Sequence, residues 1–246
     1  MSSVSFLNPE EARTLEGIFN QYITSKTSVA LSKLLSEPVS HDVRILDNGV
    51  SHIKNVKLEP DEITMCAVRL NGKGDTHIEI LYTIKQKHAT KIAAKLLCQE
   101  SVCEIDEMGA SAIQEVANIM TGSFFNALSH GTGFRVDLST PNYTKDKLYS
   151  LVDTSAKDIS NPTDCAVIAD VELVGNSSGT KLHMIIMQNT IDAKKLLENH
   201  SEKTPAPLES KSEFDRLLED ETPSYPVGGE NSELDALLGD ILQEKH

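Results

Sequence analysis

Residues 106–130, DEMGASAIQEVANIMTGSFFNALSH, form the stretch that decides the fold of this 246-residue chain. Its apolar residues recur every three or four positions, which predicts a long amphipathic helix. At 100° per residue, Ser111, Glu115 and Asn118 fall on the side opposite to the apolar stripe. We therefore expect the stripe to face a core and the three polar side chains to face solvent. The stripe consists of Ile113, Val116, Ala117, Met120, Phe124 and Ala127.

A glycine lies on the polar side of this helix. Gly122 follows Asn118 by one turn, and a glycine inside a helix costs about 1 kcal/mol relative to alanine. One interpretation is that it keeps the surface beside Asn118 clear of a side chain. The alternative is a solvated helix face that tolerates a glycine.

The first 200 residues contain an internal duplication. Three short matches keep the same order at nearly the same spacing, which predicts two structural repeats, about residues 8–100 and 105–200. The matches are Ala30-Leu31-Ser32 with Ala127-Leu128-Ser129, Cys66-Ala67-Val68 with Cys165-Ala166-Val167, and Ala93-x-Lys95-Leu96-Leu97 with Ala193-x-Lys195-Leu196-Leu197.

Each repeat has the pattern helix, strand, irregular stretch, hairpin, short helix. Six strands with antiparallel pairing and internal pseudo-symmetry follow, so the predicted fold class is α+β. We expect the hairpins to turn through Asn71–Gly74 and Gly175–Gly179, where glycines supply a positive φ. The predicted helices are 9–36, 106–130, 86–98 and 190–199, and the predicted strands are 39–46, 135–139, 63–70, 77–84, 165–174 and 181–188.

Residues 201–246 differ in composition from residues 1–200. They hold 12 acidic and 4 basic residues and four of the nine prolines. Such a segment buries little apolar surface, so we predict a folded body over 1–200 and a disordered acidic tail. Within the tail, Ser212–Asp220 is repeated as Ser232–Asp240, and each copy has the pattern of a short amphipathic helix.

The polar residues of the long helix belong to a longer pattern. Ser111, Glu115, Asn118 and Pro141 have the spacing [DS]-x3-E-x2-N-x22-P. This pattern resembles the active-site motif of the CheC/CheX/FliY family of chemotaxis phosphatases. The run from Asn118 through Gly122 to Ala127-Leu128-Ser129 is similar to the same family, and the duplicated body resembles CheC.

The resemblance implies a phosphatase that hydrolyses the aspartyl phosphate of a CheY-like response regulator in two-component signalling. Asn118 would position the attacking water, because a carboxamide both accepts and donates hydrogen bonds. Glu115 would fix the docking of the receiver, with Ser111, Gly122 and Pro141 in supporting places. No cofactor is expected in this chain. The divalent metal, Mg²⁺, would be held by the receiver, and the sequence has no metal-ligand motif of its own.

The first repeat departs from the motif in two possible registers. Alignment on Asn20 puts Arg13, Gly17 and Val43 at the Ser, Glu and Pro positions. Alignment on Ala30-Leu31-Ser32 instead puts Thr14, Ile18, Gln21 and Arg44 at the four positions. Neither register supplies a glutamate, so we expect one active site, with Asn20 an ordinary polar residue.

The second tail segment is similar to the acidic Asp-x-Leu-Leu peptides with which the CheZ, FliM and FliY proteins capture phosphorylated CheY. It is expected to recruit the receiver. The alternatives are a solubilising tail, or short helices that pack back on the body. The predicted partner-binding residues are Leu234, Asp235, Leu237, Leu238 and Ile241.

The composition disfavours several other classes. The net charge of −14 argues against binding to nucleic acid or to an anionic membrane surface. There is neither a secretory signal nor an apolar run that could span a bilayer, so a cytoplasmic protein is expected. A non-catalytic module that binds CheY-like receivers or the deamidase CheD is the main alternative to a phosphatase, and a structural protein with coincidental spacing is a third.

Overall fold

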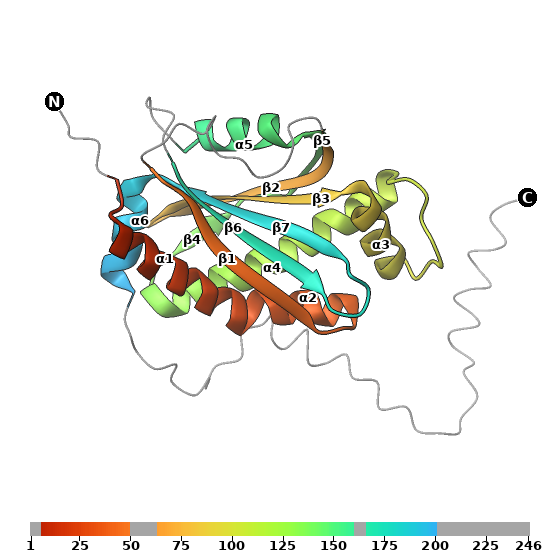
Figure 1. The fold of residues 1–246 in the computed structure, drawn as a ribbon, viewed down its shortest axis with the longest axis horizontal. Helices are drawn as coiled ribbons and strands as arrows, with labels where there is room; N and C mark the ends of the chain where they lie inside the picture. The colour runs from red at the N-terminus through yellow and green to blue at the C-terminus, as the bar shows by residue number, and fades with distance from the viewer. Residues whose placement is uncertain (1–5, 50–62, 160–165, 201–246) are drawn as a thin grey trace, which may run out of the picture. The chain divides into compact units, whose positions relative to one another are not determined.

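The computed structural model describes residues 6–49, 63–159 and 166–200. Within these ranges one antiparallel sheet of seven strands carries helices on both faces (Figure 1). The strands are β1 (Val39–Asn48), β2 (Thr64–Gly74), β3 (His77–Lys85), β4 (Val136–Leu138), β5 (Asn142–Lys147), β6 (Val167–Gly175) and β7 (Lys181–Gln188). The helices are α1 (Pro9–Tyr22), the π-helix η1 (Ile23–Thr27), α2 (Ser28–Leu35), α3 (Gln86–Leu96), α4 (Glu107–Thr132), α5 (Leu148–Lys157) and α6 (Thr190–Asn199).

The two repeats interlock through their edge strands. The strand order is β1-β6-β7-β3-β2-β4, and β5 also pairs with β2. Strand β1 of the first repeat therefore pairs with the hairpin of the second repeat, while β4 and β5 of the second pair with the hairpin of the first. Strands β3 and β7 meet at the centre. The predicted α+β class with an antiparallel, pseudo-symmetric sheet is confirmed.

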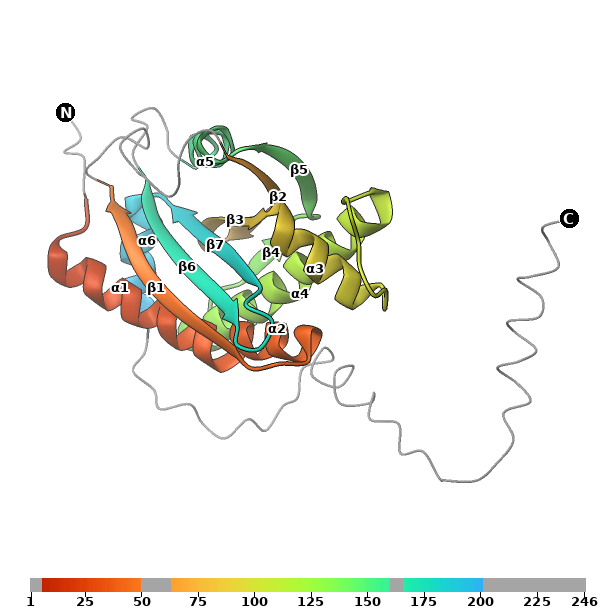
Figure 2. The same ribbon diagram turned by 45° about the vertical axis from the view of Figure 1, so that its right-hand side comes forward.

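Helices cover the two faces of the sheet unequally. Helix α5 lies on one face, and α1, α2 and α4 lie on the other (Figures 1 and 2). Side chains of each strand alternate between two cores. Val68 and Leu70 of β2 belong to the core under α1 to α4 and α6, whereas Ala67 of the same strand packs with Leu151 and Val152 of α5.

Helix α4 follows its sequence prediction closely. The side chain of Asp106 accepts a hydrogen bond from the Gly109 amide at 2.8 Å and caps the first turn. Gly133, with a φ of +78°, ends the helix in the left-handed conformation. The ring of Phe124 packs against Phe19 and Tyr22 of α1, each with ring centroids 6.0 Å apart. These contacts fix which side of α4 is buried and leave the opposite side exposed.

The first long helix contains a π-helical turn that the sequence did not reveal. Ten positions lead from Asn20 to Ala30 but only nine from Asn118 to Ala127. Helix η1 lies within the longer interval, and a π-helical turn accommodates one extra residue. The register based on Asn20 therefore describes α1, and the register based on Ala30 describes α2. In α1 the position equivalent to Glu115 is Gly17.

The stretch after β4 was predicted to be irregular, and this was wrong. It contains β5 and α5, so the described residues form seven strands rather than six. Strand β5 lies at the sheet edge and most of its residues are exposed. Its sequence is therefore polar and lacks the alternation of apolar residues by which a strand is predicted. Helix α5 does have a helical pattern that could have been recognised: Leu148, Leu151, Val152 and Ala156 are all buried.

The first hairpin turn was also misplaced. Asn71–Gly74 belongs to β2, and the chain reverses at Asp75 and Thr76. Gly72 and Gly74 are not among the glycines with positive φ. Gly72 is instead required for packing, because a Cβ there would lie 2.6 Å from Cε1 of Phe125 on α4. In the second hairpin, Gly179 does have the expected positive φ, +63°.

Several predictions fall outside the described residues. Cys165, where the second hairpin was predicted to begin, is one of them, and so is the whole predicted tail, 201–246, with both of its repeated segments. Among the described helices, none is long and apolar enough to cross a membrane.

Candidate functional site on helix α4

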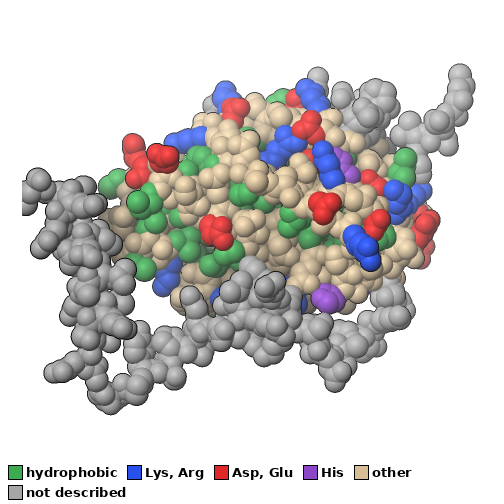
Figure 3. All heavy atoms as spheres, turned by 180° about the vertical axis from the view of Figure 1, so that it is seen from behind, with side chains coloured by type: hydrophobic (Ala, Val, Ile, Leu, Met, Phe, Trp, Pro, Cys, Tyr) green, Lys and Arg blue, Asp and Glu red, His purple; other side chains and the backbone are tan. Residues whose placement is uncertain are grey.

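The three polar motif residues of α4 are all exposed. Ser111, Glu115 and Asn118 lie along one side of the helix, as the helical wheel predicted. Within the described part of the chain, their side chains form no hydrogen bond or ion pair. In Figure 1 α4 runs behind the strands, and Figure 3 shows the molecule from that side, with hydrophobic side chains scattered among polar ones. The carboxylate and the carboxamide are thus available to a partner.

Gly122 leaves open space beside this pair. A Cβ built on it would have no heavy atom within 4 Å outside the local helix. Its backbone is helical and it is not among the positive-φ glycines. Neither packing nor backbone conformation therefore requires a glycine here, although a helix-interior glycine costs about 1 kcal/mol relative to alanine.

Pro141 is connected to α4 through a residue that the motif does not include. The side-chain amide of Gln114 donates a hydrogen bond from Nε2 to the Pro141 carbonyl oxygen, at 3.0 Å. Gln114 directly precedes Glu115 in the sequence and lies one turn before Asn118. Sequence reasoning missed it, although its four-residue spacing from Asn118 placed both on one row of the helix.

Buried contacts beneath the motif fix α4 on the sheet. The hydroxyls of Thr121 and of Tyr82 on β3 are hydrogen bonded at 3.0 Å, and both residues are buried. Burial raises the pKa of Tyr82 well above its usual value, so the phenol stays neutral. Phe125 packs over Gly72 of β2. The polar face is therefore presented by a helix that cannot rotate freely.

The equivalent position in the first repeat is arranged differently. The Asn20 Oδ1 atom lies 3.2 Å from Nε2 of His41, and the Thr24 hydroxyl lies 3.1 Å from the same nitrogen. Since the Thr24 hydroxyl donates to the Asn20 backbone carbonyl at 2.7 Å, Nε2 must carry the proton and donate to both oxygens. Burial lowers the pKa of His41, which favours this neutral ring. The carboxamide oxygen of Asn20 is thus already in use.

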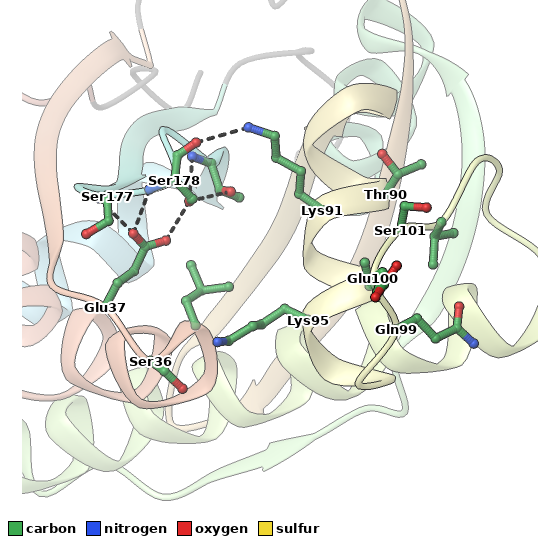
Figure 4. Close-up of a pocket in the computed structure, with 14 residues that line it drawn as sticks. Ser36, Glu37, Thr90, Lys91, Lys95, Gln99, Glu100, Ser101, Ser177 and Ser178 are labelled. Carbon is green, nitrogen blue, oxygen red and sulfur yellow. Dashed lines mark hydrogen bonds between the residues drawn. The ribbon is translucent and has the colours of Figure 1, made fainter.

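One cavity in the described residues lies away from the motif. It has a volume of about 660 Å³ and lies between the end of α2, α3 and the β6–β7 turn. Figure 4 shows the Glu37 carboxylate against this turn, accepting hydrogen bonds from the amides of Ser177 and Ser178 at 2.7 and 2.8 Å. The Ser178 hydroxyl also donates to Glu37 and is the main reason that the Glu37 pKa is lowered. Lys91 donates to the Ser178 carbonyl oxygen at 3.0 Å. The lining contains no residue of the motif.

The described residues contain no group of three or more His, Cys, Asp or Glu side chains that could hold a metal ion. The motif residues on α4 offer the carboxylate of Glu115, the carboxamide of Asn118 and the hydroxyl of Ser111. Such groups can orient a water molecule and pair with a cation on a partner.

Fold and site together define an internally duplicated α+β protein that presents a carboxylate and a carboxamide on its long helix. A model of the CheC-like family matches residues 108–143, from the first turn of α4 to the start of β5. The matched segment contains Ser111, Glu115, Asn118 and Pro141.

Solved structures of FliY and of a FliM middle domain share the fold of this chain. FliY from Thermotoga maritima is 21% identical, with a TM-score of 0.62 over 79% of this chain and 97% of that one. The FliM middle domain from H. pylori is 12% identical, with a TM-score of 0.51 over 78% of this chain and 99% of that one. A chain of the CheX–CheY–BeF3–Mg complex from Borrelia burgdorferi is a weaker match: 18% identity and a TM-score of 0.47, over 69% of this chain and 97% of that one.

Proposed function

We propose that this chain is a phosphatase that hydrolyses the aspartyl phosphate of a CheY-like response regulator. The observation that carries the proposal is that Glu115 and Asn118 lie together on the exposed side of α4, without partners among the described residues. They occupy the Glu and Asn positions of the motif inside the segment that the CheC-like family model matches.

Asn118 is assigned the positioning of water. Its side-chain oxygen accepts a hydrogen bond from the water, which aims a lone pair of the water oxygen at phosphorus. The new bond joins that oxygen to phosphorus, and the bond from phosphorus to the aspartyl oxygen breaks. The products are inorganic phosphate and the free aspartate carboxylate, and the proton of the water leaves with phosphate or solvent. Because phosphoryl transfer has a loose transition state, positioning supplies much of the rate.

Glu115 is assigned the docking of the receiver. Its carboxylate would pair with a lysine of the receiver near the phosphoryl group, which fixes Asn118 against the reacting phosphorus. A divalent ion, Mg²⁺ in this proposal, would be held by the receiver, where it would neutralise charge on the phosphoryl oxygens. Ser111 is given a supporting place at the end of the same row. By resemblance, CheD is a second candidate partner.

A second candidate is a module that binds a CheY-like receiver, or CheD, without catalysis. The similarity in fold to FliY and to the FliM middle domain does not separate this candidate from the phosphatase, because a shared fold does not distinguish a phosphatase from a binding protein. The carboxylate and carboxamide pair beside open space supports the phosphatase, because these groups can pair with a cation on the partner and orient a water molecule.

The two candidates are separated by following the decay of a phosphorylated receiver. CheY-like receivers are phosphorylated with acetyl phosphate or their own kinase, the donor is removed, and the phosphoprotein is measured with and without the full chain. A phosphatase accelerates the decay at substoichiometric concentration. A binding module leaves the rate unchanged or slows it, and that result would overturn the proposal.

A further inference from the structure

The turn between β4 and β5 is fixed on two sides. We call residues 139–141 the β4–β5 corner. The amide of Ser139 donates to the Asn71 carbonyl at 2.8 Å, and the Ser139 hydroxyl accepts from the Asn71 amide at 2.9 Å. These two bonds hold the start of the corner on β2. On the other side, the Gln114 side chain holds the Pro141 carbonyl at 3.0 Å.

The chemistry of Pro141 makes this second contact informative. Proline has no backbone N–H, so its carbonyl is its one polar backbone group. Gln114 is partly buried at the border between the core side and the exposed side of α4. Gln114 and Asn118 are four residues apart and so are neighbours on the helix surface. The Pro141 carbonyl is therefore bonded to a side chain that leaves the helix one turn before Asn118.

From this geometry we propose that Gln114 is a positioning residue, which holds the β4–β5 corner in place before the receiver binds. The corner would then form one side of the docking surface that contains Glu115 and Asn118. This inference rests on the proposed function, because the surface is assigned to docking of the phosphorylated receiver. It also accounts for the place of Pro141, 23 positions beyond Asn118, in the same motif. Gln114 does not touch the reacting atoms and acts through Pro141.

The experiment compares Gln114→Met with Gln114→Ala in the full chain. Methionine keeps the length of the side chain and removes the donor, while alanine removes both. The matched control is Gln21→Met, which changes an exposed glutamine of α1. For both Gln114 variants we expect KM for the phosphorylated receiver to rise about three- to tenfold, the effect of losing one hydrogen bond, with kcat within about twofold.

A second measurement does not depend on activity. Hydrogen–deuterium exchange of the free protein should become faster over residues 138–143 in both Gln114 variants, with α4 unchanged. The Gln21 control should show neither effect. The test requires that the wild-type protein is active and that Asn118→Ala abolishes this activity. If the Gln114 variants then show unchanged exchange and an unchanged KM, the role of Gln114 is overturned. If the wild-type protein itself has no phosphatase activity, the proposed function fails instead, and faster exchange would still establish that Gln114 holds the corner.

Discussion

The carboxamide oxygen of Asn20 lies 3.2 Å from Nε2 of His41 and accepts a hydrogen bond from it. Asn118, the equivalent residue of the second repeat, has no such partner among the described residues. The two repeats therefore differ in more than the missing glutamate. In the first repeat the carboxamide is occupied by a strand residue of its own chain, whereas in the second it is free to bind a water molecule.

Replacement of Asn20 by alanine should leave the phosphatase rate within about twofold of the wild-type value. Gly17 provides no carboxylate for docking, and His41 already holds the Asn20 oxygen, so the first repeat lacks both parts of a site. Steady-state dephosphorylation of the receiver checks this. A rate reduced to half, as for loss of one of two equal sites, would mean that the first repeat is active.

Gly122→Ala should raise the stability of the fold and lower the activity. An added methyl group meets no atom of the protein within 4 Å, and alanine stabilises a helix interior by about 1 kcal/mol over glycine. The same methyl group would occupy the space that a receiver docked on Asn118 needs, so kcat/KM should fall about tenfold, the effect of losing about 1.4 kcal/mol of binding energy. Thermal unfolding and kinetics measure the two effects separately.

Gly17→Ala is the matched control for that variant. Gly17 is an exposed glycine inside α1, and a Cβ there also has no neighbour within 4 Å. It should give a similar gain in stability with unchanged kinetics. If both glycine variants retain full activity, the space beside Asn118 has no role in docking.

Met108→Gln should weaken docking of the receiver. Met108 is 60% exposed and precedes Ser111 by one turn on the side of α4 that carries the motif. Covering such a side chain with a partner contributes on the order of 1 kcal/mol, so KM should rise about fivefold with little change in kcat. Ile191→Gln is the control, because Ile191 on α6 is 66% exposed but lies outside the segment that contains the motif. Equal effects of the two variants would contradict a specific contact.

Much of the fold could be predicted because its elements carry strong apolar periodicity. The stripe of α4 and the repeated matches predicted the long helix, the central hairpins and the duplication. Strand β5 could not be predicted in this way, since edge strands exposed on most sides show no alternation. Helix η1 was hidden for a different reason: a π-helical turn leaves no mark in one sequence except a register that shifts by one residue.

The site could be predicted as far as its exposed polar residues, because three of them share one face of a helix with regular geometry. The contact of Gln114 could not be predicted from the sequence. It depends on the β4–β5 corner, which lies beside α4 because β4 and β5 both pair with β2. Open space at Gly122 agrees with both interpretations of this glycine, the cleared surface and the solvated face. The packing requirement at Gly72 was mistaken for turn chemistry, because the sequence does not show that Phe125 lies over β2.

Truncation after His200 should raise KM for the phosphorylated receiver and leave kcat nearly unchanged. Residues 201–246 carry 12 acidic residues and two related apolar segments. If these segments hold the receiver weakly, tethering raises its local concentration to roughly millimolar, which acts on binding rather than on chemistry. The double substitution Leu237→Ala and Leu238→Ala should reproduce the effect. Loss of kcat on truncation would mean that these residues contribute to the site itself.

The account depends on Asn118, and the dephosphorylation rate of the Asn118→Ala protein is its most direct test. Because Asn118 is exposed, the variant should keep the wild-type circular dichroism spectrum and unfolding temperature. Its kcat should fall about a hundredfold, as for removal of one aimed polar group from a catalytic site. Glu115→Ala should lose activity with a larger effect on KM. Wild-type turnover by a correctly folded Asn118→Ala protein would contradict the assignment of the site to α4.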